Sequence, residues 1–151
     1  MADEKLGRTG RLSGGPADEL VRAGHRVEIE QAERLASSLS LSDLAHAVAL
    51  VESGALDAAT AAGLTRGLLE LHAIPAEAFP WDSERGDAFN SREHELRRRV
   101  GPASSGWLTA GRPRREAFRV ALRLVARAQT LDLHDAVLET ASALADQAQL
   151  H

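Results

Sequence analysis

The sequence predicts an all-α fold, with a small N-terminal helical head followed by a long helix (or helical hairpin) that packs in an oligomeric bundle. First, the 151 residues are rich in Ala and Leu but only 3% aromatic, whereas sheets favour aromatic and β-branched residues. Second, apolar residues recur at helical spacing and no segment alternates as a strand does. Third, neither Gly nor Pro occurs from residue 114 to the end.

The first half of the chain predicts a lead-in and two helices. Residues 1–16 contain four glycines and no periodicity, so we expect a flexible lead-in. Residues 17–36 predict a helix, and residues 37–42 a break. Ser42 or Asp43 is then the expected N-cap of a helix that ends at Gly54. The residues expected on or beside its inner face are Leu44, Ala47, Val48, Leu50 and Val51.

The next two helices begin at aspartates. Asp57 is a good N-cap for a helix through about His72. Its predicted inward positions are Ala61, Leu64, Leu68 and Leu71. Asp87 predicts the start of another helix through about Val100. The intervening residues 74–82 and the later residues 103–113 contain Pro, Ser and Gly and predict loops.

Residues 114–149 predict one helix of roughly 50 Å at about 1.5 Å per residue. Alternatively, Thr130 or Asp132 starts a second helix after a tight turn. A head of this size cannot cover the distal half, so we expect homo-oligomerisation through these apolar positions. The predicted domains are the lead-in (1–16), the head (17–111) and the long helix (112–151).

Charge is segregated along the chain. Residues 85–127 hold eleven arginines and four acidic residues, whereas the rest holds seven basic and eighteen acidic residues. Such a region is expected to meet an anion or the acidic part of another subunit, unless it is a solvated helix face. Nucleic-acid binding is not expected, because the whole chain is acidic and carries no recognisable nucleic-acid motif.

Several other sites are not expected from the composition. The chain has no Cys, so it forms no disulfide and no thiolate metal site. The six histidines lack metal-site spacing, and we expect neither metal nor cofactor. No apolar run resembles a signal peptide or a membrane span, so no membrane contact is expected and the cytoplasm is the expected location.

Four segments carry a family resemblance in the same order and spacing. They are residues 45–54 (AHAVALVESG), 64–71 (LTRGLLEL, through Leu64, Gly67, Leu68 and Leu71), 86–96 (GDAFNSREHEL) and 109–116 (TAGRPRRE). Together they resemble the N-terminal part of argininosuccinate lyase, in the fumarase/aspartase superfamily. The resemblance implies a chain truncated to the family's first domain plus the first long helix of its second. It also implies that the family's general acid and base lie in segments beyond this sequence.

The departures from the family pattern concern its chemistry. Phe89 stands where the family motif Asp-x-His has an imidazole, and Thr109 replaces the His of His-Thr-Gly-Arg. Arg115 and Glu116 replace an Asn-Asp pair. Because the imidazoles are missing, we do not expect argininosuccinate lyase activity, and we assign no catalytic residue.

The retained loop suits an anion, because guanidinium groups pair with carboxylates and a helix start adds partial positive charge. The candidate substrate-binding residues are Phe89, Asn90, Trp107, Thr109, Arg112, Arg114 and Arg115. We expect an anionic, partly apolar small molecule of a specialised biosynthetic pathway, with a lyase, isomerase or cyclase reaction open. Alternatively, these arginines pair with acids of a neighbouring helix. The protein would then be a non-catalytic interaction module or, with a partner subunit, half of a split lyase.

Overall fold

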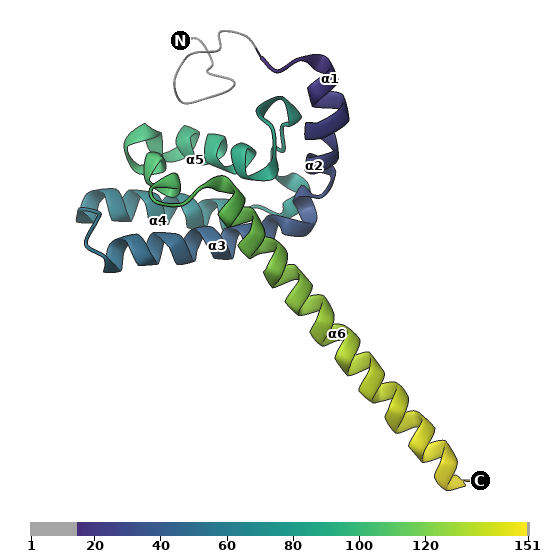
Figure 1. Ribbon diagram of the computed structural model, residues 1–151. Coiled ribbons are helices and arrows are strands. Elements are labelled where there is room, and N and C mark those ends of the chain that lie inside the picture. The colour runs from purple at the N-terminus through teal and green to yellow at the C-terminus, as the bar shows by residue number, and fades with distance from the viewer. Residues whose placement is uncertain (1–14, 151) are drawn as a thin grey trace.

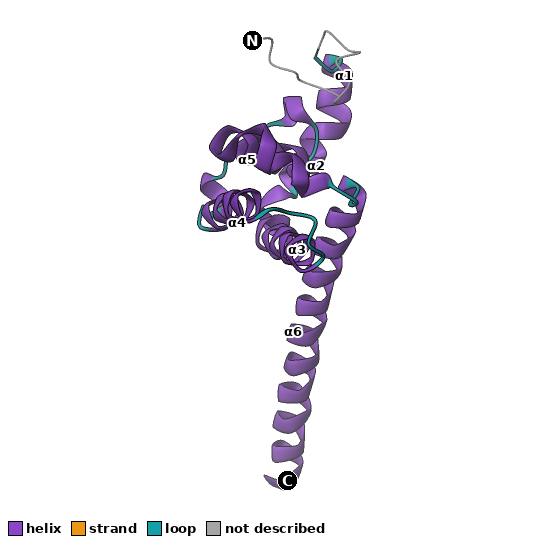
Figure 2. Ribbon diagram, turned by 90° about the vertical axis from the view of Figure 1, so that its left-hand side faces the viewer, coloured by secondary structure: helices purple, strands orange, loops and turns teal. Residues whose placement is uncertain are grey.

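The computed structural model describes residues 15–150, and this part of the chain is helical with no strand, which confirms the all-α prediction (Figures 1 and 2). The predicted lead-in lies mostly outside the described residues. Apart from short 3-10 turns, the elements are α1 (Asp18–Leu20), a π-helical turn (Val21–His25), α2 (Arg26–Glu30), α3 (Ala32–Glu52), α4 (Ala58–His72), α5 (Ala88–Ser105) and α6 (Arg114–Leu150). None of these helices is long and apolar enough to cross a membrane.

The head is built from α3, α4 and α5, with α3 and α4 side by side (Figure 2). Asp57 caps α4 as predicted, because its side chain accepts a 2.9 Å hydrogen bond from the Thr60 amide. The predicted apolar stripe of α4 is also confirmed, since Leu64, Leu68 and Leu71 are buried. They meet Phe89 and Leu96 of α5 and Leu108 in one core cluster.

Two glycines let α4 and α5 approach closely. A Cβ atom on Gly67 would lie 2.6 Å from Val100 Cγ1 and 2.7 Å from Leu96 Cδ1. A Cβ atom on Gly63 would lie 2.6 Å from Ser104 Oγ. All three distances are shorter than real Cβ contacts, so a side chain at either position would force its neighbours to move, and the close helix contact depends on these glycines.

The predicted break at residues 37–42 is wrong, because α3 runs unbroken from Ala32 to Glu52. Ser42 and Asp43 are not caps and lie buried in the middle of this helix. The interruption occurs earlier, at Gln31, which separates α2 from α3. Ser42 and Asp43 are residue types that often cap helices. Here their side chains bind arginine side chains from distant parts of the chain and do not accept from the free amides of a helix start.

The buried face of α3 also differs from the predicted one. Ala47 is buried and Leu44 and Leu50 are partly buried, as expected. Val48 and Val51, however, are 55% and 46% exposed. The head therefore leaves part of the apolar surface of α3 uncovered.

The helix at Asp87 is confirmed, with the aspartate accepting a 2.9 Å bond from the Asn90 amide. Helical geometry is interrupted at Gly101, where φ is 75° and ψ is 169°. Glycine adopts this conformation without a steric penalty. Helical turns then continue to Thr109, so much of the predicted loop 103–113 is helical.

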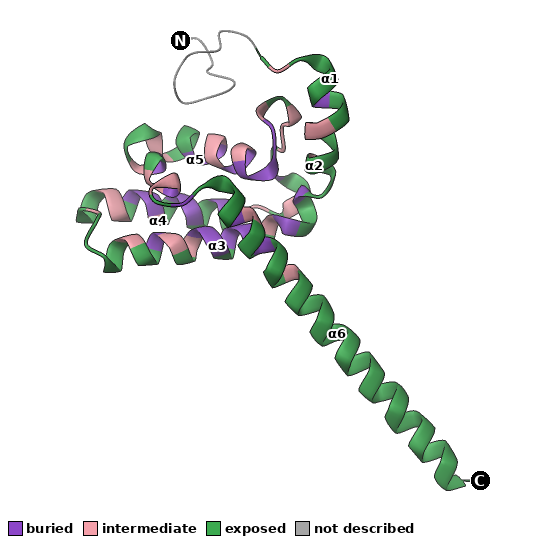
Figure 3. Ribbon diagram, viewed as in Figure 1, coloured by how far each residue is buried: buried purple, intermediate pink, exposed green. Residues whose placement is uncertain are grey.

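α6 is one continuous helix of 37 residues, about 55 Å long at 1.5 Å per residue. Its first turns pack against α3, with Ala117 and Ala121 buried. From residue 126 to residue 150 every residue is exposed, and the helix projects away from the head (Figure 3).

Candidate functional site

The centre of the head contains a buried ion-pair cluster of three residues from distant parts of the chain. Asp43 of α3 is 0% exposed, Arg92 of α5 is 1% exposed and Arg112, just before α6, is 6% exposed. Asp43 Oδ1 accepts a 2.7 Å bond from Arg112 Nη2, and Asp43 Oδ2 accepts a 3.1 Å bond from Arg92 Nε. The cluster thus ties α3, α5 and the start of α6 together.

Arg112 makes further hydrogen bonds inside the head. Its Nη1 donates to the Ser42 carbonyl at 3.0 Å and to Ser42 Oγ at 3.1 Å, and its Nη2 also contacts the Leu108 carbonyl at 3.4 Å. The guanidinium lies 5.7 Å from the centre of the Phe89 ring. This arrangement commits Arg112 to internal partners and makes it an anchor for the chain entering α6.

The electrostatics of the cluster are unbalanced. Two guanidinium groups share a single carboxylate, so the three residues carry a formal charge of about +1 at neutral pH. The Phe89 ring offers a favourable face to the Arg112 cation. Burial and the charge of Arg112 lower the pKa of His46, one turn after Asp43. The surroundings of Arg112 therefore disfavour a further cation.

Three of the predicted ligand-binding residues gather at the start of α5. Arg114 Nη1 lies 3.1 Å from Asp87 Oδ2, and the Arg114 side chain is 45% exposed. Asn90 donates from Nδ2 to the Arg85 carbonyl at 2.9 Å. Phe89 points into the core cluster. Arg114 and Asn90 thus border solvent, whereas Phe89 is closed off from it.

The other predicted residues lie around the loop before α6. Thr109 donates its hydroxyl to the Gly106 carbonyl at 3.4 Å, and Trp107 packs against the core cluster while partly buried. Arg115 is exposed. The structure therefore does not gather the seven residues into one pocket. It brings Arg112 and Phe89 together in the core and leaves the cationic surface to Arg114 and Arg115.

Sequence reasoning missed Asp43 as the partner of Arg112, and it missed Arg92 as the second arginine that binds Asp43. Arg92 lies in an Arg- and Glu-rich stretch that is typical of a solvated helix. The available signal was helical spacing, because Arg92 lies three residues after the inward Phe89 and four before the inward Leu96. Within residues 15–150, no group of three His, Asp or Glu side chains is arranged to hold a metal ion.

Comparison with known proteins identifies relatives that align with most of the chain. Argininosuccinate lyase from Thermobifida fusca is 34% identical over 141 residues, and the enzyme from Methanopyrus kandleri is 32% identical over 145 residues. These alignments cover 93% and 95% of this chain. The chain is related to the argininosuccinate lyases. It spans 29% and 27% of the length of these two lyases.

The argininosuccinate lyase resemblance therefore extends from the motifs to nearly the full chain. A third lyase, from Mycobacteroides abscessus, is 33% identical over 144 residues. No family model matches the chain, and no solved structure does. Phe89 stands where the lyase motif Asp-x-His has its imidazole. Its ring is buried and lies against the guanidinium of Arg112. Arg112, the first arginine of the Gly-Arg-x-Arg segment, is thus held by hydrogen bonds inside the head.

Proposed function

We propose that this lyase-related protein is an assembly module in which α6 pairs antiparallel with α6 of a second copy. The observation that carries the proposal is the exposed distal part of α6, on which apolar side chains lie in ordered rows. Leu124, Leu131 and Leu138 follow each other at intervals of seven residues, and Ala145 continues the row. Val137 and Leu144 form an adjacent row. Apolar residues that repeat every seven positions are typical of helices that pair in a coiled coil.

The charges of α6 favour an antiparallel over a parallel pair. Residues 114–127 hold five arginines and one glutamate, whereas residues 128–150 hold four acidic residues and neither Arg nor Lys. An antiparallel pair places the basic part of each helix beside the acidic part of the other. A parallel pair would place like charges together, which is unfavourable.

The helix dipole adds to this preference. Cations near the N-terminus and anions near the C-terminus oppose the dipole of an isolated helix. In the first turn of α6, Arg114 and Arg115 outnumber Glu116, and Asp146 lies in the last two turns, so the net charge at both ends has the unfavourable sign. An antiparallel partner supplies compensating charge at both ends.

The oligomeric state tests the proposal. We expect sedimentation to give a dimer or larger assembly, and Leu138→Glu to convert it to monomer. Ala143→Glu is the matched control, because it adds the same charge about 140° away around the helix. A wild-type chain that stays monomeric would overturn self-pairing and favour a separate partner subunit.

The absence of cysteine allows the orientation to be tested directly. Val120→Cys places a thiol on α6 close to the head, and Ala145→Cys places one near its tip; both positions are exposed. In an antiparallel pair, oxidation of a mixture of the two variants gives mainly the mixed disulfide. Predominant like-with-like disulfides would refute the antiparallel arrangement.

A second candidate function is the binding of an anionic, partly apolar small molecule of a specialised pathway. The supporting observation is the cationic surface at the start of α6, where Arg115 is exposed and Arg114 forms an ion pair with Asp87. Thermal shift in the presence of carboxylate-bearing metabolites tests it. A ligand-induced shift that survives both Arg114→Ala and Arg115→Ala would count against this site.

A further inference from the structure

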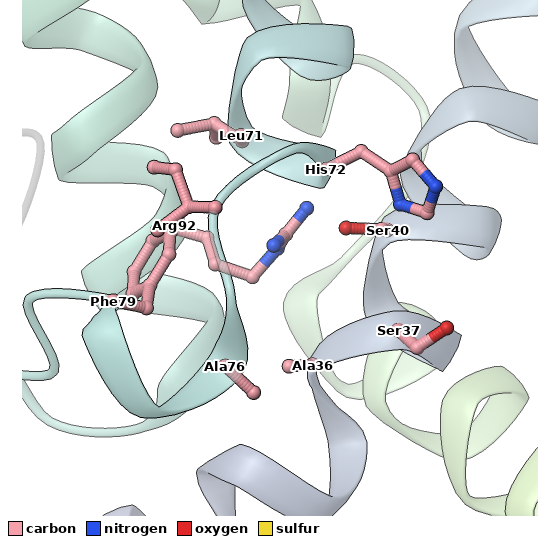
Figure 4. A pocket seen from close by; sticks show the side chains of 9 residues that line it. Ala36, Ser37, Ser40, Leu71, His72, Ala76, Phe79 and Arg92 are labelled. Carbon is pink, nitrogen blue, oxygen red and sulfur yellow. The ribbon is translucent and has the colours of Figure 1, made fainter.

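A pocket in the head lies apart from the loop before α6. Its volume is about 210 Å³. It is lined by residues of α3, of the end of α4, of the segment that follows α4, and of α5. Ala36, Leu71, Ile74 and Phe79 supply apolar lining, and Ser40, His72 and Arg92 supply polar groups (Figure 4). None of these residues belongs to α6, so the pocket is a property of the head alone.

The unusual feature of this pocket is the guanidinium of Arg92. Figure 4 shows it directed toward the space beside Ser40 and His72. Arg92 Nε is bonded to Asp43, but Nη2 is buried and has no hydrogen-bond partner among the described residues. A buried donor without a partner is costly, and the cost is greater when the donor is charged.

Asp43 cannot neutralise Arg92 fully, because its other oxygen is bonded to Arg112. The excess positive charge of the cluster therefore faces the pocket through Arg92. The Phe79 ring, 5.8 Å from the guanidinium carbon, is the aromatic neighbour on the Arg92 side. An anion in the pocket would satisfy the free donor and balance the charge.

We infer that this pocket binds a small monocarboxylate with a short apolar tail. The carboxylate would accept a hydrogen bond from Arg92 Nη2 beside Ser40 and His72, and the tail would contact Leu71, Ile74 and Phe79. A single excess charge matches a monoanion better than a multiply charged group. The volume is below the roughly 300–1,000 Å³ of pockets for drug-sized ligands, which limits the tail to a few carbons.

Titration of the isotope-labelled protein with 3-methylbutanoate, followed by NMR, tests this assignment. We expect saturable shifts of the Arg92 Nε–Hε signal and of the backbone amides of Ser40 and His72. The uncharged 3-methylbutanamide has the same shape and should bind at least about tenfold more weakly. Equal shifts with the amide, or no saturable shift with the acid, would overturn the inference.

A pocket-filling variant provides the matched protein control. Ala36→Leu places a larger side chain in the pocket, whereas Ala49→Leu adds the same atoms to an exposed position of the same helix. Ala36→Leu should weaken binding at least about tenfold and Ala49→Leu by less than about twofold. Unchanged binding in a folded Ala36→Leu variant would place the ligand elsewhere.

The same titration in the Leu138→Glu variant separates this inference from the pairing of α6. Because the pocket is formed within the head, the affinity should stay within about twofold of wild type. A dependence of binding on the oligomeric state would contradict a site confined to one head. Loss of assembly with unchanged binding would support both proposals.

Discussion

Replacing Asp43 by Asn tests the buried ion-pair cluster most directly. The substitution keeps the shape of the side chain but leaves Arg92 and Arg112 as two buried cations without a counter-charge. The Asn amide group would also turn two donors toward one of the guanidinium groups. Breaking a buried pair in this way typically costs about 3–5 kcal/mol, a large part of the 5–15 kcal/mol that stabilises a domain.

Urea unfolding followed by circular dichroism measures this loss. With a slope of about 2 kcal/mol/M, a 4 kcal/mol loss lowers the midpoint by about 2 M. Protein concentration must be fixed, because assembly adds to apparent stability. Asp132→Asn, an exposed change on α6, should stay within about 0.5 kcal/mol of wild type. An Asp43→Asn loss below 1 kcal/mol would show that water already relaxes the cluster.

Three further predictions concern the head. Gly67→Ala should lower stability by about 1–2 kcal/mol in the same assay, because crowding of α5 outweighs the helix propensity gained, whereas Gly106→Ala in open space should not. Burial lowers the pKa of His46, so stability should fall as the pH drops below about 6.5, and His46→Gln should flatten that slope. Hydrogen bonds from Arg98 lower the pKa of Glu95, so its contribution is present above the usual carboxyl pKa and lost as the pH falls through the lowered one. Carboxyl NMR titration and acid unfolding of Glu95→Gln test this.

Local signals predicted the helices well where the side chains act locally. Asp57 and Asp87 cap helices because each carboxylate accepts from an amide three residues later. Thr130 is a residue type that also caps helices, but here its hydroxyl donates to the Ala126 carbonyl inside the continuous helix α6. The sequence pattern does not distinguish this internal bond from a cap, so it left one helix and two helices as alternatives.

The candidate site was less predictable because its partners are far apart in the chain. The separation between Asp43 and Arg112 is 69 residues, and that between Asp43 and Arg92 is 49. The sequence left open whether Arg112 meets a ligand or an acid of a neighbouring helix. Which of these occurs depends on how α3 and α5 pack, because that packing decides where Asp43 lies.

The anchoring of Arg112 has a mechanical consequence for the far end of the molecule. Arg112 lies two residues before α6, and its internal hydrogen bonds constrain the direction in which that helix leaves the head. Over a lever of about 55 Å, a rotation of 10° at the base displaces the tip by about 10 Å. Substitutions at this pivot that leave the head folded should therefore misalign distant surfaces without altering a single residue on them.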